Sequence, residues 1–430
     1  MHIGTGFTMD RIQAFSAELS RIYDGGDKPA QSQAGRLSGL YEKMCRAFPG
    51  TGTLRLFSSP GRTEIGGNHT DHQGGCVLCA AIGLDILALV RQTDEPIVKL
   101  ASEGFERIDT VDLLKMDREP SETGHSASLI RGIAAWYREY GFQVGGFEAY
   151  TISNVPRGSG LSSSAAFEVL IAEIFSVMFN NGAVPAVSRA RSAQYAENVY
   201  FGKPSGLMDQ TACAIGGVIT IDFADADAPV IRPVSSRLEL GGHLLVVTDT
   251  GGSHADLTAD YASIPQEMRL VAQEFGAGRL SMVDKDTFYR QLPRLLGRLP
   301  DRALIRAMHF FGETRRALDE ADALRSGDMP EFLRLVNASG RSSWTLLQNV
   351  LIPHNHKNQR LALGLALAEQ LLGGQGAVRV HGGGFAGTLQ AFVPRDQLAA
   401  YVEGMNALFG TESSSLLHIR PYGACEVLLP

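Results

Sequence analysis

Hydrophobic positions recur along this chain with two different periods, which predicts a mixture of helices and strands. Residues 9–48 carry apolar side chains at helical spacing around a loop-like stretch at 24–35, and we interpret residues 1–50 as a helical N-terminal extension. From Thr53 onward, short apolar runs predict strands and longer runs at helical spacing predict helices. The strands are expected at 54–58, 77–90, 96–101 and 147–153, and the helices at 165–179, 190–200 and 303–326.

The order of these elements indicates the fold class. Strands and helices interleave without a strict strand-helix repeat, which favours an α+β fold over a doubly wound parallel sheet. A weakly marked boundary near 240–242 divides the rest of the chain into one unit at 51–240 and another at 241–430. The length of 430 residues agrees with two or three packed units at about 150 residues per domain.

Composition narrows the classes of partner. Hydrophobic residues make up 44% of the chain and charged residues 20%, as in ordinary globular proteins, which excludes disordered and fibrous classes. The formal net charge is −7, and no dense basic run offsets it. We therefore expect neither nucleic acid nor an anionic membrane surface as a main partner.

The cysteines and the N-terminus indicate the compartment. Five cysteines are an odd number in a long chain, which does not suggest a disulfide framework. Cys76 and Cys79 form a C-x-x-C pair that zinc or redox chemistry would also explain, but they lie in or beside the apolar run 77–90, where small hydrophobes are expected. That run is too short for a membrane span and contains Asp85. No secretory signal is visible at residues 1–10, so we expect a cytoplasmic protein.

The segment 155–168 has the pattern of a phosphate-binding loop. Glycines let the backbone approach a ligand closely, and hydroxyls then fall at the first turn of the helix expected from Ala165. A Gly/Ser linker capped by a serine is the alternative. The segment 155–168 is not a Walker A loop, because no Gly-Lys-Ser/Thr completes it. The positive charge that the Walker lysine would supply must therefore come from elsewhere. The candidate phosphate-binding residues are Gly158, Ser159, Gly160, Leu161, Ser162, Ser163 and Ser164.

A second polar segment, 60–75, lies between two apolar runs. Sugar hydroxyls need donors and acceptors at fixed geometry, and Asn68, His69, Thr70 and Asp71 supply both. Two other interpretations stay open: a metal site at His69, Asp71 and His72, whose spacing does not match a common helical pair, and a polar surface loop.

The third segment, 378–387, satisfies G-x-G-x-x-G after a strand. We do not interpret it as a dinucleotide-binding motif, because residues 388–393 look like another strand and not a helix. A tight turn of Gly382, Gly383 and Gly384 between two strands, close to the phosphate loop, fits better.

One acidic position lies at a helix start. A helix carrying Glu197 is expected to end at Gly202, and a new helix to begin after Ser205, which places Asp209 in its first turn. Such an aspartate is very often only structural, so the local pattern does not give it a role.

Taken together and in their order along the chain, the segments 60–75, 155–168 and 378–387 resemble the three motifs of the GHMP small-molecule kinases. The segment at 60–75 resembles the galactokinase signature Gly-Arg-x-x-x-Ile-Gly-Glu-His-Thr-Asp-Tyr, and the likeness runs from about Thr53 to the C-terminus. The resemblance implies a two-domain α+β fold with the active site between the domains. It also implies MgATP as the donor and transfer of the γ-phosphoryl group to the anomeric C1 hydroxyl of galactose.

The resemblance further implies roles for single residues. Asp209, in Gly-Leu-Met-Asp-Gln, matches the catalytic aspartate, and Arg62 matches the arginine beside it. Glu197 matches the acidic Mg²⁺ ligand, with Ser164 as its hydroxyl partner. The expected sugar-binding positions are Asn68, His69, Thr70, Asp71, Gly206 and Tyr261. We expect a monomer. A carboxylate beside Arg62 should have a pKa at or below about 3.9, which makes Asp209 a weak base, so positioning competes with proton abstraction as its role.

Departures from the family pattern leave the substrate open. Asn68 stands where the family has the glutamate that contacts the C6 hydroxyl, His72 stands for Tyr, and Ser205 for Cys. We expect galactose, with galacturonate, arabinose and N-acetylgalactosamine as alternatives. A galactokinase-like sensor with little catalysis, and a mevalonate or homoserine kinase, are the other classes. The intact serine-rich loop and the His-Thr-Asp array favour a sugar kinase over both.

Overall fold

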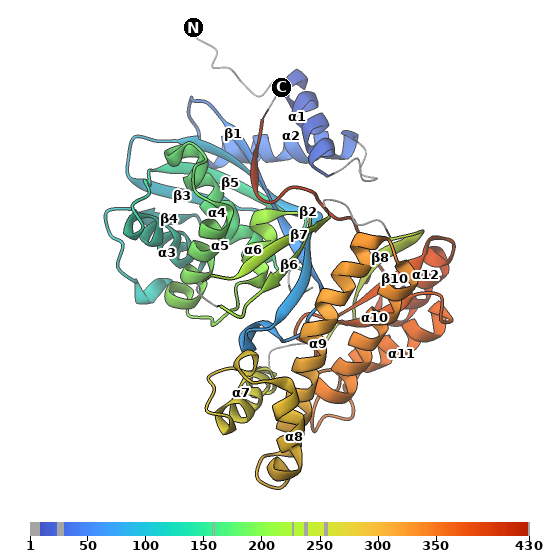
Figure 1. Ribbon diagram of the computed structural model, residues 1–430. Helices are drawn as coiled ribbons and strands as arrows, with labels where there is room; N and C mark the ends of the chain where they lie inside the picture. Colours follow the sequence, from blue (N-terminus) through green and yellow to red (C-terminus); the bar gives the residue numbers. More distant parts are fainter. Residues whose placement is uncertain are drawn as a thin grey trace.

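The computed structural model describes residues 9–23, 30–156, 158, 160–225, 228–235, 240–252 and 257–428. Within them the chain forms two β-sheets with helices packed on their faces (Figure 1). Parallel pairing is confined to one strand pair in the larger sheet, and no strand-helix repeat runs through the described part. The predicted α+β class is therefore confirmed.

The larger sheet has eight strands. Its main path runs β12-β1-β2-β5-β3-β4, and β6 and β7 continue from the other half of β2. All neighbours are antiparallel except β3 and β5. The strands are β1 (Arg55–Gly66), β2 (Cys76–Gln92), β3 (Ile97–Ser102), β4 (Asp109–Asp112), β5 (Phe147–Ser153), β6 (Val218–Asp222), β7 (Val230–Ser235) and β12 (Cys425–Val427).

Strand β2 is apolar almost throughout because both of its faces are covered. Leu87 and Leu89 join a core with the N-terminal helices, whereas Ala88 and Val90 face the opposite core. The two-residue alternation of a strand places these pairs on opposite faces, so a continuous apolar run is expected in a sheet buried on both sides.

The helices over this sheet lie in two groups (Figure 1). Helix α4 packs on β1 and β2 on one face, and α2 packs on β2 and β5 on the other. Helix α2 begins at Ala30, so the predicted loop at 24–35 is wrong for 30–35, and 24–29 lie outside the described residues. The helices are α1 (Met9–Ile22), α2 (Ala30–Ala47), α3 (Ser126–Glu139), α4 (Ser163–Asn180), α5 (Ala186–Tyr195) and α6 (Met208–Ile215), with a π-helical turn at Ala196–Phe201.

The smaller sheet has the order β11-β8-β10-β9, with every pair antiparallel. Its strands are β8 (His243–Asp249), β9 (Ala377–His381), β10 (Thr388–Pro394) and β11 (Ser414–Leu417). The long helix α9 packs against β2, α7 and α10 and so joins the two halves. The helices of this half are α7 (Thr258–Glu274), α8 (Lys285–Leu295), α9 (Asp301–Ser326), α10 (Met329–Ser342), α11 (Arg360–Leu372) and α12 (Leu398–Phe409).

Two expectations about boundaries meet the structure differently. The predicted polar segment at 60–75 is not a surface loop in its first half, because β1 continues through Gly66 and is buried there. The division at 240/241 stays a prediction. A division at this point would not separate the two sheets completely, because β12, near the C-terminus, pairs with β1 in the larger sheet.

Candidate active site

The centre of the site is an ion pair between β1 and α6. Arg62 donates from Nε and Nη2 to the two carboxylate oxygens of Asp209, both at 2.7 Å, and from Nη1 to the carbonyl of Gly160. Ser162 donates its hydroxyl to Asp209 Oδ2. The β1–β2 register shifts between Pro60 and Arg62, and such a bulge re-aims a side chain. A strand, a loop and a helix start thus meet at one carboxylate.

The phosphate loop surrounds this pair. Gly158 and Gly160 have φ of +73° and +70°, which glycine adopts without penalty, and Ser162 has φ of +58° as the residue before α4. Leu161 is buried, and its carbonyl accepts from the backbone N–H of Arg62 at 3.1 Å. Ser163 and Ser164 open α4 as predicted. Ser159 lies outside the described residues.

The charge state of Asp209 follows from its neighbours. Burial by itself would raise the pKa of this carboxyl, but the Arg62 guanidinium and the Ser162 hydroxyl outweigh burial, and the pKa lies below its usual value. Its side chain is 30% exposed, so the ionised carboxylate is open on one side. Asp209 is therefore an ionised carboxylate that does not readily accept a proton.

An acidic pair lies beside Asp209. Gln210 donates its side-chain amide to Glu197 Oε2 at 2.9 Å and to Glu168 Oε2 at 3.0 Å. Lys203 donates to Glu197 Oε1 at 2.7 Å. Glu168 Oε1 is buried with no hydrogen-bond partner, and burial together with Glu197 raises the pKa of Glu168 well above its usual value. The amide of Gln210 thus bridges the two carboxylates, and the Lys203 ammonium pairs with one of them.

The sugar signature approaches Asp209 from the other side. A Cβ at Gly206 would collide with Asp71 Oδ2, so these two positions touch. Burial raises the pKa of the Asp71 carboxyl, and the nearby Asp209 charge acts in the same direction. His69 approaches the carbonyl of Gly383 with its Nε2 at 3.0 Å. Residues of the segments 60–75 and 378–387 are therefore brought together.

The side chains of two predicted sugar-binding residues already form hydrogen bonds with other groups of the protein. Thr70 is fully buried and donates its hydroxyl to the carbonyls of Gly67 and Cys76 at 2.9 and 2.7 Å. Asn68 is 1% exposed, and its amide bonds only to protein groups. Direct contact of either residue with a substrate stays a prediction, and these hydrogen bonds do not favour it.

The glycine turn closes the site. It joins β9 to β10, whose Thr388 pairs with His381, so the predicted turn between two strands is observed. Gly383 packs against the ring of Tyr261, whose hydroxyl donates to the carbonyl of Gly384 at 2.6 Å. Tyr261 therefore lies at the turn, next to His69.

Comparison with known proteins decides the family. The family model for the galactokinase galactose-binding signature matches residues 46–92, and that for the GHMP kinases N terminal domain matches residues 128–217. The galactokinase of Limosilactobacillus fermentum is 31% identical over 368 residues, which cover 83% of this chain and 90% of that relative. The chain belongs to the galactokinase family. The galactokinase of Lactobacillus helveticus, 30% identical over 86% of the chain and 94% of that relative, agrees.

Solved structures share the fold. Lactococcus lactis galactokinase complexed with galactose superposes with a TM-score of 0.77 at 26% identity, covering 90% of this chain and 99% of that one. Methanococcus jannaschii mevalonate kinase gives a TM-score of 0.61 at 14% identity, over 86% of this chain and 99% of that one, which shows the fold alone. The predicted resemblance to GHMP kinases and galactokinases is confirmed.

Sequence reasoning missed several polar residues of this galactokinase-family site. Lys203 pairs with Glu197 at 2.7 Å, and its place six residues after Glu197 was the available signal. That another cation supplies the charge of the absent Walker lysine stays a prediction. Glu168 lies one helical turn after Ser164, which puts both on one face of α4. Asn349 gave no signal, because it lies far in the chain from the three segments. His381 lies within the segment 378–387, but the pattern of that segment pointed only to its glycines.

The alternative metal interpretations gain no support. Among the described residues, no group of three or more His, Cys, Asp or Glu side chains is placed to hold a metal ion. Cys79 is fully buried in β2, and burial raises its thiol pKa, as expected for a small hydrophobe. Both ring nitrogens of His72 are buried without a hydrogen-bond partner.

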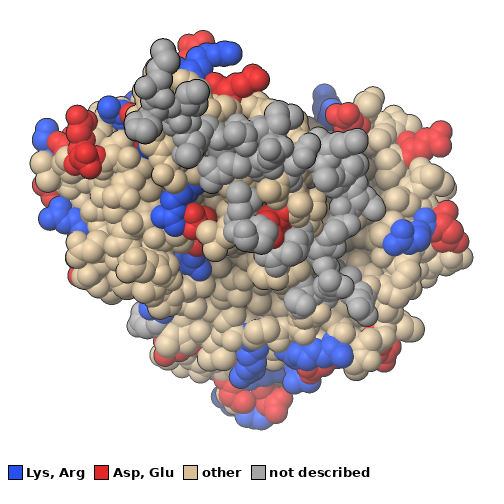
Figure 2. All heavy atoms as spheres, turned by 90° about the horizontal axis from the view of Figure 1, so that it is seen from above, with Lys and Arg blue, Asp and Glu red and all other residues tan. Residues whose placement is uncertain are grey.

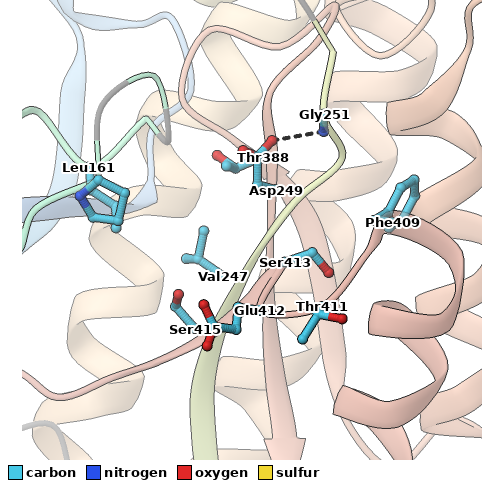
Figure 3. Close-up of a pocket in the computed structure, with 11 residues that line it drawn as sticks. Leu161, Val247, Asp249, Gly251, Thr388, Phe409, Thr411, Glu412, Ser413 and Ser415 are labelled. Carbon is cyan, nitrogen blue, oxygen red and sulfur yellow. Dashed lines mark hydrogen bonds between the residues drawn. The ribbon is translucent and has the colours of Figure 1, made fainter.

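A pocket of about 280 Å³ adjoins the phosphate loop on the side of the smaller sheet (Figure 3). Leu161 lies on one side of it, and Val247, Asp249 and Thr388 lie across from it. The loop thus contacts the larger sheet through Arg62 and has open space toward the smaller one.

Proposed function

We propose that this protein is an ATP-dependent galactokinase that transfers the γ-phosphoryl group of ATP to the anomeric C1 hydroxyl of galactose, giving galactose 1-phosphate. The observation that carries the proposal is the position of the Asp209 carboxylate. Arg62 and Ser162 hold it beside the phosphate loop, and on the sugar side it lies near enough to Asp71 for its charge to raise the Asp71 pKa. Membership of the galactokinase family supports ATP and galactose as the substrates.

In this proposal the phosphate loop binds ATP. The N-terminus of α4 offers free backbone N–H groups and a positive dipole end, and Ser163 and Ser164 add hydroxyl donors, whereas the Ser162 hydroxyl donates to Asp209. Arg62 stabilises charge that develops on the transferring phosphoryl group. The strand ends that flank the Gly382–Gly384 turn, at His381 and Thr388, lie close to Gly160 of the loop.

Asp209 acts on the sugar hydroxyl mainly by positioning it. The low pKa of this carboxyl makes it a weak base, and in a loose phosphoryl-transfer transition state the nucleophile loses its proton late. The open carboxylate oxygen accepts a hydrogen bond from the C1 hydroxyl and aims it at the phosphorus. His69, Asp71, Gly206 and Tyr261 shape the sugar side, whereas Asn68 and Thr70 hold the signature together.

The acidic pair is suited to a divalent cation. The buried, unpartnered Glu168 Oε1 and the Lys203 ammonium on Glu197 indicate a site that attracts positive charge. Glu197 and Ser164 would hold Mg²⁺, with Glu168 beside them, and oxygen ligands of this kind match its preference. When bound, Mg²⁺ would neutralise charge on the β- and γ-phosphates.

An ATP-coupled assay over galactose, galacturonate, arabinose and N-acetylgalactosamine tests the function. We expect the highest kcat/KM with galactose. A higher kcat/KM with another sugar would favour a related sugar 1-kinase, and sugar binding without turnover would favour a sensor.

We further propose a cytoplasmic monomer that binds neither nucleic acid nor membranes. The net charge of −7 and the interspersed acidic and basic side chains in Figure 2 support this. Helix α4, Ser163–Asn180, is long and apolar enough to span a membrane, but 61% of it is buried in the fold. Light scattering at micromolar concentration tests the monomer, and a dimer mass would contradict it.

A further inference from the structure

Asn68 uses its whole hydrogen-bonding capacity within the protein. A side-chain amide has two N–H donors and two acceptor lone pairs. The Nδ2 group of Asn68 donates to the carbonyl of Gly382 at 2.7 Å and to Glu64 Oε1 at 3.0 Å. Its Oδ1 accepts from Asn349 Nδ2 at 2.8 Å and from the Ser343 hydroxyl at 3.4 Å. No donor or acceptor of this amide is left for a sugar hydroxyl.

Asn349 completes the arrangement from the opposite side. It is fully buried, and the same Nδ2 group that binds Asn68 also donates to the carbonyl of Gly383 at 3.0 Å. Its backbone carbonyl accepts from the N–H of Phe385. The two amides therefore bind each other and two consecutive carbonyls of the glycine turn.

The turn needs such support because its backbone is unusual. Gly382 and Gly384 have φ of +68° and +83°, and Phe385 has φ of +56°, which is costly for a residue with a side chain. Every carbonyl from Gly382 to Gly384 has a side-chain partner from another part of the chain.

The ends of the turn carry this geometry to the phosphate loop. His381 Nδ1 lies 2.9 Å from the Thr388 hydroxyl, and a Cβ at Gly160 would lie 3.0 Å from that hydroxyl. His381 Nε2 lies 3.1 Å from the hydroxyl of Thr63, the neighbour of Arg62. A shift of the turn would therefore move groups that contact both the phosphate loop and strand β1, which carries Arg62.

We propose that Asn68 and Asn349 form an amide clamp that holds the Gly382–Gly384 turn on the phosphate loop, and that Asn68 does not bind the sugar. Both are positioning residues. The proposal deepens the proposed function, on which it rests, because it couples the sugar signature to the ATP side through this turn.

The test uses Asn68→Ala, Asn349→Ala and the double variant in the full chain. We expect kcat to fall about 10- to 100-fold and the KM for ATP to rise, because small misplacements near the reacting groups have effects of this size. Because both substitutions break one unit, the kcat of the double variant should be no lower than that of the more impaired single variant. Independent, multiplying losses would overturn the clamp.

Sugar binding separates positioning from recognition. Calorimetry without ATP should give each variant the wild-type Kd for galactose within about twofold, and the wild-type ratio of Kd values for galactose and 6-deoxygalactose. If Asn68→Ala removes that ratio, residue 68 binds the C6 hydroxyl and the proposal is overturned.

Asn337→Ala is the matched control. Asn337 donates to the carbonyl of Gly376 at 3.2 Å and accepts from the N–H of Val378 at 3.1 Å, at the other end of β9. It should leave kcat and the KM for ATP unchanged. Equal kinetic losses in all three single variants would mean a merely structural role and would also overturn the clamp.

Hydrogen exchange keeps the clamp and the enzyme activity distinguishable. The Phe385 amide should exchange faster in Asn68→Ala and Asn349→Ala than in wild type or Asn337→Ala. This readout needs no turnover, so an inactive wild type would refute the proposed function and not the clamp. Unchanged exchange in both variants would refute the clamp alone.

Discussion

Two aspartates of this protein, one fully buried and one partly exposed, have the same kinds of partner and different surroundings. Asp85 on β2 accepts from the hydroxyl of Tyr23 at 2.5 Å, from Arg36 at 2.6 Å and from Arg420 at 3.4 Å, and also from a serine hydroxyl. Its side chain has no exposed area. Asp209 has one arginine and one serine as partners and is 30% exposed.

The difference separates a structural carboxylate from the one that we propose is catalytic. Arginine partners keep the pKa of both carboxyls below the usual value, so both are ionised at neutral pH. Donors from four segments surround Asp85, and it ties the N-terminal helix α2 and the C-terminal segment to the sheet. Asp209 keeps one side open, next to Asp71, where a hydroxyl group can bind.

Removal of the open carboxylate has the largest expected effect. Asp209→Asn should lower kcat roughly 10³-fold, because the amide cannot supply the negative charge that orients the nucleophile. Galactose binding should stay close to wild type, and kcat is taken per folded molecule because the buried Arg62 loses its counter-charge. Stopped-flow turnover with near wild-type kcat would show that Asp209 is not the catalytic group.

Removal of the fully hydrogen-bonded carboxylate of Asp85 should instead lower the stability of the fold. Asp85→Asn leaves Arg36 and Arg420 buried without a counter-charge, which is expected to lower the free energy of unfolding by about 3–5 kcal/mol. The readout is the urea midpoint, with kcat per folded molecule unchanged. Glu331→Gln, which breaks an exposed pair with Arg334, is the control and should leave the midpoint unchanged.

The acidic pair gives a smaller and more specific effect. Glu197→Gln should raise the Mg²⁺ concentration needed for half-maximal velocity about tenfold or more, because a neutral amide is a poorer ligand than a carboxylate. Velocity measured against Mg²⁺ at saturating ATP checks this. An unchanged Mg²⁺ requirement would remove Glu197 from the metal site.

The smallest effect is a difference in pH dependence within the site. The pKa of Asp71 is raised above 3.8, whereas that of Asp209 is lowered below it. As the pH falls, Asp71 should protonate first, so the KM for galactose rises while kcat is still held. The opposite order in steady-state kinetics between pH 7 and 4 would contradict this assignment.

The depressed pKa of Asp85 also fixes the direction in which the stability of the fold depends on pH. Because the folded pKa of Asp85 is depressed, its stabilisation is complete above the unfolded pKa of about 3.9 and is lost as the pH falls through the lower folded value. The gap in stability between wild type and Asp85→Asn should therefore be constant from pH 8 to 5 and shrink below pH 4.

Local pattern could predict the elements that bear the site but not their polar partners. The phosphate loop, the first turn of α6 and the glycine hairpin follow from glycine placement and periodicity. The role of Asp209 came only from the family resemblance. Asp85 was visible merely as a charge in an apolar run, because its partners at Tyr23, Arg36 and Arg420 are distant in the chain.

Strand β1 shows a second limit. Its last residues, through Gly66, look like a polar loop because they face a buried polar network and not an apolar core. Glu64 pairs there with Arg379 at 2.7 Å and accepts from Asn68. Hydrophobic periodicity cannot detect a strand whose inward face is polar, and functional sites are where such conflicts are expected.

The most direct test is ³¹P NMR of the product that purified wild-type protein forms from galactose and MgATP. We predict one new phosphate monoester, on the C1 oxygen of galactose, formed in equal amount to ADP. Phosphate on any other oxygen of the sugar, or ADP formed with free inorganic phosphate alone, would contradict an Asp209 carboxylate that aims the anomeric hydroxyl at the phosphate loop.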